Sequence, residues 1–112
     1  MLQKDSTFRA VQKEGCNFLC ACYLGGLNTI DEADECFEWA STTPISKNSK
    51  QTKVRRSDSY VNMDKNALAD EIAQRYGRIR RDGTVIKGNN HFYVVDDKGN
   101  EIFNSSGPGR GH

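Results

Sequence analysis

The spacing of apolar residues changes at about Gly77, and this change limits the folds open to the chain more than any other feature of its sequence. Before Gly77, apolar residues recur every three or four positions, as they do on one face of an amphipathic helix. After Gly77 they alternate with polar residues, as they do in a half-buried strand. Helices followed by a run of strands predict an α+β fold in which the strands form an antiparallel sheet.

Three helices are expected in the first part of the chain. Residues 16–24 are apolar almost throughout and are followed by two glycines, so the helix that they form should be buried at the centre of the fold. Residues 30–41 follow a capping-box pattern, and residues 64–76 carry an apolar stripe at helical spacing. Residues 1–15 show no such pattern and are expected to form a short polar lead-in.

Four strands and two irregular segments complete the predicted fold. The strands are expected at residues 78–80, 84–87, 91–96 and 101–104, of which 91–96 is the strongest and 78–80 the weakest. A long polar loop is expected at about residues 41–58, and a flexible, glycine-rich tail at residues 105–112. The length of 112 residues predicts a single domain over residues 1–112, with the central N-terminal helix packed on the C-terminal sheet.

Charge and hydropathy argue against several classes of protein. Sixteen Lys and Arg residues are balanced by fifteen Asp and Glu residues, which leaves a net charge of +1 and no strong overall field for a polyanion or a membrane surface. Basic residues cluster at 47–56 and at 75–81, where we expect a solvated face or a protein-binding one rather than a nucleic-acid site. No apolar run reaches the ~20 residues that span a bilayer, and the first residues lack the apolar stretch of a secretory signal. We therefore expect a cytoplasmic protein, although a virion-borne or injected protein fits the same pattern.

The four cysteines, at positions 16, 20, 22 and 36, admit three interpretations. An even number of cysteines in a short chain can form a disulfide framework, but this requires an oxidising compartment that no secretory signal supports. Cys16, Cys20, Cys36 and His91 together would provide enough ligands for zinc, yet the sequence has no C-x-x-C pair. The interpretation that we prefer is a reduced protein with one reactive thiol, which needs no metal and no cofactor.

Cys16 is the candidate for that reactive thiol. It follows Gly15, whose missing side chain permits a close backbone approach just before the helix begins. In the first turn of a helix, free N–H groups and the positive end of the helix dipole stabilise a thiolate, which is the nucleophilic form of cysteine. The same N–H groups are suited to binding the oxyanion of a tetrahedral intermediate. The other three cysteines are expected in the core.

His91 is the candidate base, because His112 at the end of the sequence is its only rival. It begins the strongest predicted strand, where rigid backbone would hold the imidazole while leaving it accessible. Asn104, on the following strand, interrupts an apolar run and can accept a hydrogen bond from the imidazole if the hairpin register shifts by one or two residues. Ser105 and Asp96 are the alternatives for this third position.

The chain resembles the papain-like cysteine peptidase superfamily through two short motifs and one later residue, namely Gly15-Cys16-Asn17-Phe18-Leu19-Cys20, then His91-Phe92-Tyr93-Val94-Val95, then Asn104. It is similar in style to the small bacterial and phage members, including the double-glycine leader peptidases of bacteriocin transporters. The resemblance implies that Cys16 is the nucleophile, His91 the base and Asn104 the residue that orients the histidine. It also implies a glutamine shortly before the cysteine as an oxyanion donor, for which Gln12 is the candidate.

The function that this resemblance implies is hydrolysis of a peptide or isopeptide bond in a peptide or protein substrate, by acyl transfer through Cys16. Peptidase, deamidase, transglutaminase-like and amidase reactions share these residues and all stay open. The principal alternative is a catalytically silent binding protein with the same fold, such as a phage or bacterial inhibitor or effector. A nucleic-acid binder is the third hypothesis, and the sequence predicts no particular oligomeric state.

Overall fold

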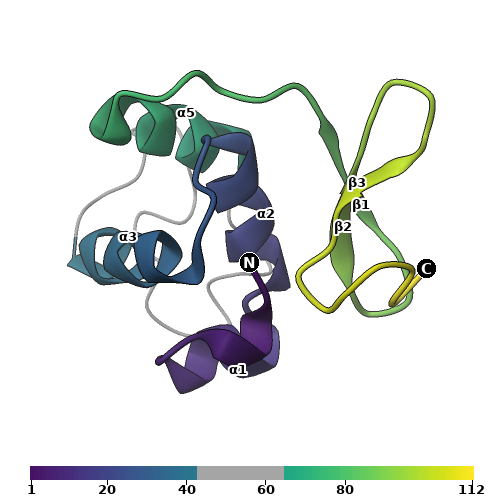
Figure 1. Ribbon diagram of the computed structural model, residues 1–112, viewed down its shortest axis with the longest axis horizontal. Coiled ribbons are helices and arrows are strands. Elements are labelled where there is room, and N and C mark those ends of the chain that lie inside the picture. The colour runs from purple at the N-terminus through teal and green to yellow at the C-terminus, as the bar shows by residue number, and fades with distance from the viewer. Residues whose placement is uncertain (43–64) are drawn as a thin grey trace.

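The computed structural model describes residues 1–42 and 65–112. Its helices are η1 (Gln3–Asp5), α1 (Arg9–Glu14), α2 (Cys16–Leu24), α3 (Ile30–Thr42) and α5 (Lys65–Tyr76), and its strands are β1 (Thr84–Lys87), β2 (Phe92–Val95) and β3 (Glu101–Phe103). The strands form an antiparallel sheet in the order β1-β2-β3, which lies to one side of the helices (Figure 1). The predicted α+β class is thereby confirmed, with N-terminal helices packed against a C-terminal sheet.

Helix α2 lies between the other helices and the sheet, as its apolar sequence predicts (Figure 1). On one side, the edge of the Phe18 ring meets the ring of Phe37 on α3, with 5.5 Å between the ring centroids. On the other side, Leu24 packs with Ala69 of α5 and Val94 of β2. Burying one large apolar side chain contributes about 1.5–3 kcal/mol. The helices and the sheet are therefore held together mainly through α2.

The segment expected to form a weak strand at residues 78–80 does not do so, and that prediction is wrong. Instead, Arg78 in this segment and Arg81 just after it bind carbonyl groups at the end of α2 and directly after it, where backbone carbonyls lack partners within the helix. The guanidinium group of Arg81 donates a hydrogen bond of 2.6 Å to the carbonyl of Tyr23, and that of Arg78 donates one of 2.9 Å to the carbonyl of Gly26. The alternation of polar and apolar residues in this segment is typical of a strand, but its arginines bind carbonyl groups at the end of a helix.

The first fifteen residues contain more regular structure than the polar lead-in that we expected. They form η1 and α1, and α1 leads into α2 through Gly15 alone. A Cβ atom at Gly15 would lie 2.6–2.8 Å from the backbone and side chain of Val11. Only glycine fits such a junction, which supports the close backbone approach inferred from the sequence. The lead-in prediction failed because α1 has only six residues and buries little apolar surface.

Replacing Gly15 with alanine should displace the start of α2. The new methyl group would meet the carbonyl oxygen of Val11 at 2.6 Å, and this backbone atom cannot rotate away as a side chain can. We expect the free energy of unfolding to fall by about 1–3 kcal/mol and the alkylation rate of Cys16 to change, as measured by urea denaturation and mass spectrometry. Gly99→Ala is the control, because it strains a hairpin turn with φ of 83° and should reduce stability without changing alkylation. A Gly15→Ala protein as stable as the parent would show that the junction tolerates a side chain.

The pairing of β2 with β3 contains a bulge that matters for the site. Val95 pairs with Glu101, whereas Val94 pairs with Phe103, so the register shifts by one residue between the two pairs. Because successive side chains point to opposite faces of a strand, this shift places Glu101 and Phe103 on opposite faces. Phe103 stacks on Tyr23 of α2, with 4.7 Å between the ring centroids. A register shift of one residue is therefore present, but it sets Phe103 rather than Ile102 opposite Val94, which is the opposite direction to a shift that would place Asn104 directly opposite His91.

The residues after β3 return toward the turn between β1 and β2. The N–H group of Asn89 donates a hydrogen bond of 2.6 Å to the carbonyl of Gly111. The His112 ring stacks on Tyr93, with 4.1 Å between the ring centroids, and its Nε2 atom lies 2.5 Å from a carboxylate oxygen of Glu101. The tail that we expected to be flexible thus makes defined contacts beside the start of β2.

The long polar loop expected at residues 41–58 falls mostly outside the described residues. Its first two positions belong to the end of α3, and residues 43–58 are not among those that the structure describes, nor is the basic cluster at 47–56. Within residues 1–42 and 65–112, no helix combines the length and the apolar character that crossing a membrane requires.

Candidate active site

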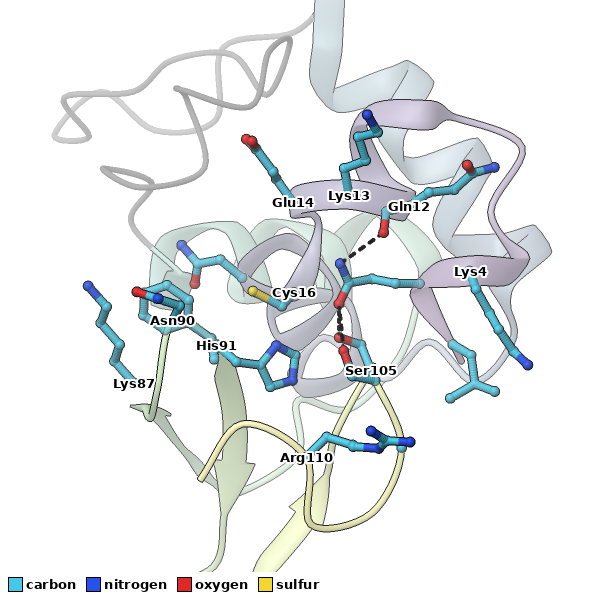
Figure 2. A pocket seen from close by; sticks show the side chains of 16 residues that line it. Lys4, Gln12, Lys13, Glu14, Cys16, Lys87, Asn90, His91, Ser105 and Arg110 are labelled. Atoms are coloured by element: carbon cyan, nitrogen blue, oxygen red, sulfur yellow. Dashed lines mark hydrogen bonds between the residues drawn. The ribbon is translucent and has the colours of Figure 1, made fainter.

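A cleft of about 820 Å³ opens between the N-terminal residues, the start of α2, the β1–β2 turn and the C-terminal turns (Figure 2). Cys16 and His91 both line this cleft, together with Gln3, Gln12 and Ser105. The fold therefore brings two of the three predicted catalytic side chains, which are 75 positions apart in the sequence, to one concave surface. Such clefts are the usual sites of small-molecule and substrate binding.

Cys16 is the one cysteine of the chain whose side chain reaches solvent. It is the first residue of α2 and is partly exposed, whereas Cys20, Cys22 and Cys36 are buried, and all four are free thiols. Burial raises the pKa of the Cys20 and Cys22 thiols well above the ordinary value, so these two stay protonated and inert. A reagent in solution should therefore meet one thiol, and that thiol lies at the N-terminal end of a helix.

The imidazole of His91 is paired with the side chain of Asn104. Its Nε2 atom lies 2.8 Å from Oδ1 of Asn104, and both side chains are buried. Of the three candidates for this position, only Asn104 makes the contact among the described residues. Ser105 instead donates its hydroxyl hydrogen bond to Gln3 at 2.7 Å, and Asp96 accepts hydrogen bonds from backbone N–H groups of its own hairpin loop.

The orientation of the Asn104 amide follows from its other partners. The Nδ2 atom donates to a carboxylate oxygen of Glu101 at 2.9 Å and to the carbonyl of Arg110 at 2.8 Å. Both partners accept hydrogen bonds, so they select the amide nitrogen and leave Oδ1 toward His91 and the N–H group of Ser106. An amide oxygen can only accept, so Nε2 of the imidazole carries a proton. In the neutral ring, Nδ1 is then unprotonated and able to take a proton.

Glu101 is a functional candidate that the sequence did not indicate. It shares a face with Asn104, three positions later, only because of the bulge in the β2–β3 pairing. The hydrogen bond from the Asn104 amide is the main cause that lowers the pKa of the Glu101 carboxyl, with smaller contributions from His112 and the Gly109 N–H group. The carboxylate is therefore the form that holds the Asn104 amide in place at neutral pH.

The lowered pKa of Glu101 predicts how stability responds to acid. A carboxyl group whose pKa is lower in the folded than in the unfolded state stabilises the fold above its unfolded value of about 4.3, and this contribution is lost as the pH falls through the folded value. We expect the decrease in Tm between about pH 5 and pH 3 to be smaller for Glu101→Gln than for the parent protein. Glu71→Gln should change this decrease in the opposite sense, because burial raises the pKa of Glu71. Equal decreases for all three proteins would contradict the role given to this carboxylate.

Cys16 and His91 face the same hollow from different elements. Figure 2 shows the Cys16 side chain at the start of α2 and the His91 ring at the start of β2, both directed into the cleft. Within the part of the chain that the structure describes, no hydrogen bond joins the sulfur to the ring. Catalytic hydrogen bonds are often long in unliganded enzymes and shorten when a substrate binds. The two groups are thus neighbours in a cleft rather than a formed ion pair.

Gln12 does not direct its amide at Cys16. Its side chain is exposed and points away from the sulfur in Figure 2, and its Nε2 atom donates a hydrogen bond of 2.6 Å to the carbonyl of Ser6. The glutamine four positions before the cysteine therefore lines the cleft, but its amide is used in a contact with Ser6.

A second glutamine, Gln3, lies in the cleft and was missed in the sequence. It is buried, and its Oε1 atom accepts the hydrogen bond from the Ser105 hydroxyl at 2.7 Å. Its Nε2 atom is left with a long contact of 3.4 Å to the carbonyl of Gln12, which is weaker than an ordinary hydrogen bond. Figure 2 draws both contacts as dashed lines. The amide of Gln3 is thus oriented by Ser105 with a donor available to the cleft.

The metal and disulfide interpretations find no support in the described residues. No group of three or more His, Cys, Asp or Glu side chains there is arranged to hold a metal ion, so Cys16, Cys20, Cys36 and His91 do not form the zinc site weighed above. The four cysteines are all free.

Comparison with protein-family models, with curated protein sequences and with solved structures finds no match to this chain. Function is therefore inferred from the arrangement of the side chains in the cleft.

Proposed function

We propose that the protein is a small papain-like cysteine hydrolase that cleaves an amide bond by acyl transfer through Cys16. The observation that carries this proposal is the buried hydrogen bond of 2.8 Å between Nε2 of His91 and Oδ1 of Asn104, at the edge of the cleft that exposes Cys16. This pairing leaves Nδ1 of the imidazole as the proton acceptor. A cysteine, a histidine and an oriented amide in one cleft are the parts that thiol-dependent acyl transfer requires.

In the acylation step, Nδ1 of His91 takes the proton of the Cys16 thiol, and the thiolate attacks the carbonyl carbon of the substrate. A carbon–sulfur bond forms, and the carbonyl oxygen becomes an oxyanion. The intermediate then collapses, the carbon–nitrogen bond breaks, and the imidazolium returns its proton to the departing amine. The product of this half of the reaction is a thioester on Cys16 and a free amine.

The oxyanion would be stabilised by donors at the mouth of α2. One such donor is the backbone N–H group of Cys16, the first residue of α2. The amide of Gln3 supplies a side-chain donor on the same cleft. We therefore assign the oxyanion role that the resemblance gives to a nearby glutamine to Gln3 in preference to Gln12.

In the second half of the reaction, water attacks the thioester while Nδ1 of His91 takes one of its protons. The carbon–sulfur bond breaks, the substrate leaves as a carboxylic acid, and the proton returns to the sulfur. An amine in place of water would give transfer rather than hydrolysis. The same residues serve both outcomes.

The formation of the acyl-enzyme can be tested without knowing the substrate. The protein is mixed with p-nitrophenyl acetate, a small activated ester, and the release of p-nitrophenol is followed in a stopped-flow instrument. We expect a rapid burst of about one product molecule per protein molecule, followed by slower turnover, with the acetyl group located on Cys16 by peptide mass spectrometry. A linear release without a burst, or acetylation confined to lysines, would overturn the proposal.

Removing the Asn104 side chain should weaken catalysis without abolishing it. In Asn104→Ala the imidazole loses the acceptor that fixes its tautomer, so we expect acylation to slow by about 10- to 100-fold. Asn100→Ala, in the exposed hairpin loop, is the matched control and should stay within about twofold of the parent rate. An acylation rate for Asn104→Ala equal to that of the control would show that the hydrogen bond has no part in catalysis.

The alternative is a binding protein that has the same fold and no activity, and the lack of a hydrogen bond between Cys16 and His91 among the described residues favours it. The two hypotheses differ in the behaviour of the sulfur. A silent cleft would leave Cys16 an ordinary exposed thiol, with no burst and no dependence of its reactivity on His91. The burst experiment therefore separates them.

A further inference from the structure

Among the described residues that line the cleft, basic side chains outnumber acidic ones. They include the basic residues Lys4, Lys13, Lys87 and Arg110, against the single acidic residue Glu14. The whole chain has a net charge of only +1. The lining of the cleft is thus more positive than the balance of charges in the chain as a whole.

These cations come from separate elements and surround the candidate catalytic pair. Lys4 belongs to η1, Lys13 to α1 and Lys87 to the end of β1, while Arg110 belongs to the turns after β3. Figure 2 shows them on different sides of the hollow that contains Cys16 and His91.

Their charges are not neutralised by neighbours in the described part of the chain. The ion pairs found there involve Arg75, Arg78, Arg80 and His112, and none of the four cleft cations. The four side chains are exposed, so each can rotate toward a ligand. A cleft lined by one sign of charge attracts ligands of the opposite sign and excludes those of its own sign.

On the basis of the proposed function, we infer that the substrate is an acidic polypeptide segment, with Asp or Glu residues on both sides of the bond that Cys16 attacks. Nucleic acids are also anionic, but they contain no backbone amide for a thiolate to attack. Cations on more than one side of the sulfur match carboxylates before and after the scissile bond. One end of such a segment would contact Lys4 and Arg110, and the other end would contact Lys87.

Binding is measured with the Cys16→Ala protein, which holds a peptide without cleaving it. Fluorescein-labelled peptides with alternating Glu and Ala residues are compared by anisotropy with otherwise identical peptides in which Gln replaces Glu. We expect the Glu peptide to bind at least about tenfold more tightly at about 50 mM NaCl, and this preference to shrink at about 300 mM NaCl.

Charge reversal locates the interaction. The double variant Lys4→Glu and Lys87→Glu, made in the Cys16→Ala protein, should remove the preference for the Glu peptide. The control is Lys98→Glu, a charge reversal at the tip of the β2–β3 hairpin and outside the cleft lining. This variant should retain the preference for the Glu peptide. Circular dichroism confirms that each variant is folded before binding is measured.

Equal affinity for the Glu and Gln peptides would overturn the inference, and so would tighter binding of a single-stranded oligothymidylate than of the Glu peptide. The ester test is independent of these results, because p-nitrophenyl acetate carries no charge. A burst without a preference for acidic peptides defeats this inference alone. A preference for the Glu peptide without a burst would contradict the proposed hydrolase and would indicate a cleft that binds acidic peptides without cleaving them.

Discussion

The Cys16→Ala protein should form no acyl-enzyme with p-nitrophenyl acetate, and its rate of ester hydrolysis should fall by at least about 10⁴-fold. The reason is that no other thiol can take over the reaction. Cys20, Cys22 and Cys36 are buried, and burial keeps the first two protonated by raising their pKa. Rates are measured by p-nitrophenol release at equal protein concentration, and the fold is checked by circular dichroism.

The control for this variant is Cys16→Ser, which preserves the volume and hydrogen-bonding capacity of the side chain. A hydroxyl is a far weaker nucleophile than a thiolate, so this protein should be as inactive as Cys16→Ala while keeping the parent stability. Residual activity of either protein near the parent rate would assign the reaction to another residue.

Replacing His91 with alanine should slow acylation by about 10²- to 10⁴-fold, which is the range that general acid–base catalysis contributes. Among the described residues that line the cleft, His91 is the only histidine and the exposed Glu14 on α1 is the only carboxylate. The rate is measured in the pre-steady-state burst, where acylation is observed directly.

His112→Ala is the matched control, because His112 is the other histidine of the chain and does not line the cleft. It contacts Tyr93 and Glu101 and can affect His91 only indirectly, through Glu101 and Asn104, so its loss should lower the rate by no more than about twofold. Comparable losses in His91→Ala and His112→Ala would show that the histidine effect is structural rather than catalytic.

Local sequence signals predicted those parts of the fold that local chemistry determines. The apolar run and following glycines gave α2 to within its observed limits, Cys16–Leu24, and the alternating pattern placed β1 and β2. The segment around Arg78 and Arg81 was misjudged because its pattern is that of a strand. Its side chains are used in contacts with a helix more than fifty positions earlier, and local periodicity carries no information about such contacts.

The site was predicted in part for the same reason. Cys16 and His91 could be recognised because a helix start and a strand start are visible in the sequence. The Asn104 contact depends on the hairpin register, which contains a bulge between Val94 and Val95 that local patterns do not reveal. Gln3 could not be found, because its orientation depends on a hydrogen bond to Ser105 from the opposite end of the chain.

The contacts of Glu101 were equally hidden. Strand residues three apart normally face opposite sides, so nothing in the sequence paired Glu101 with Asn104. Only the shifted register brings the carboxylate to the amide that holds His91.

The proposed hydrolase requires Cys16 and His91 to act as a pair, and the pH dependence of Cys16 alkylation tests this most directly. Iodoacetamide is added to native protein between about pH 5 and pH 9, and modification of Cys16 is quantified by mass spectrometry for the parent and for His91→Ala. An isolated thiol reacts slowly below its ordinary pKa of about 8.5. We predict that the parent protein still reacts readily at about pH 6 and that His91→Ala does not. Superimposable profiles that follow an ordinary thiol in both proteins would contradict the pairing and with it the proposed hydrolase.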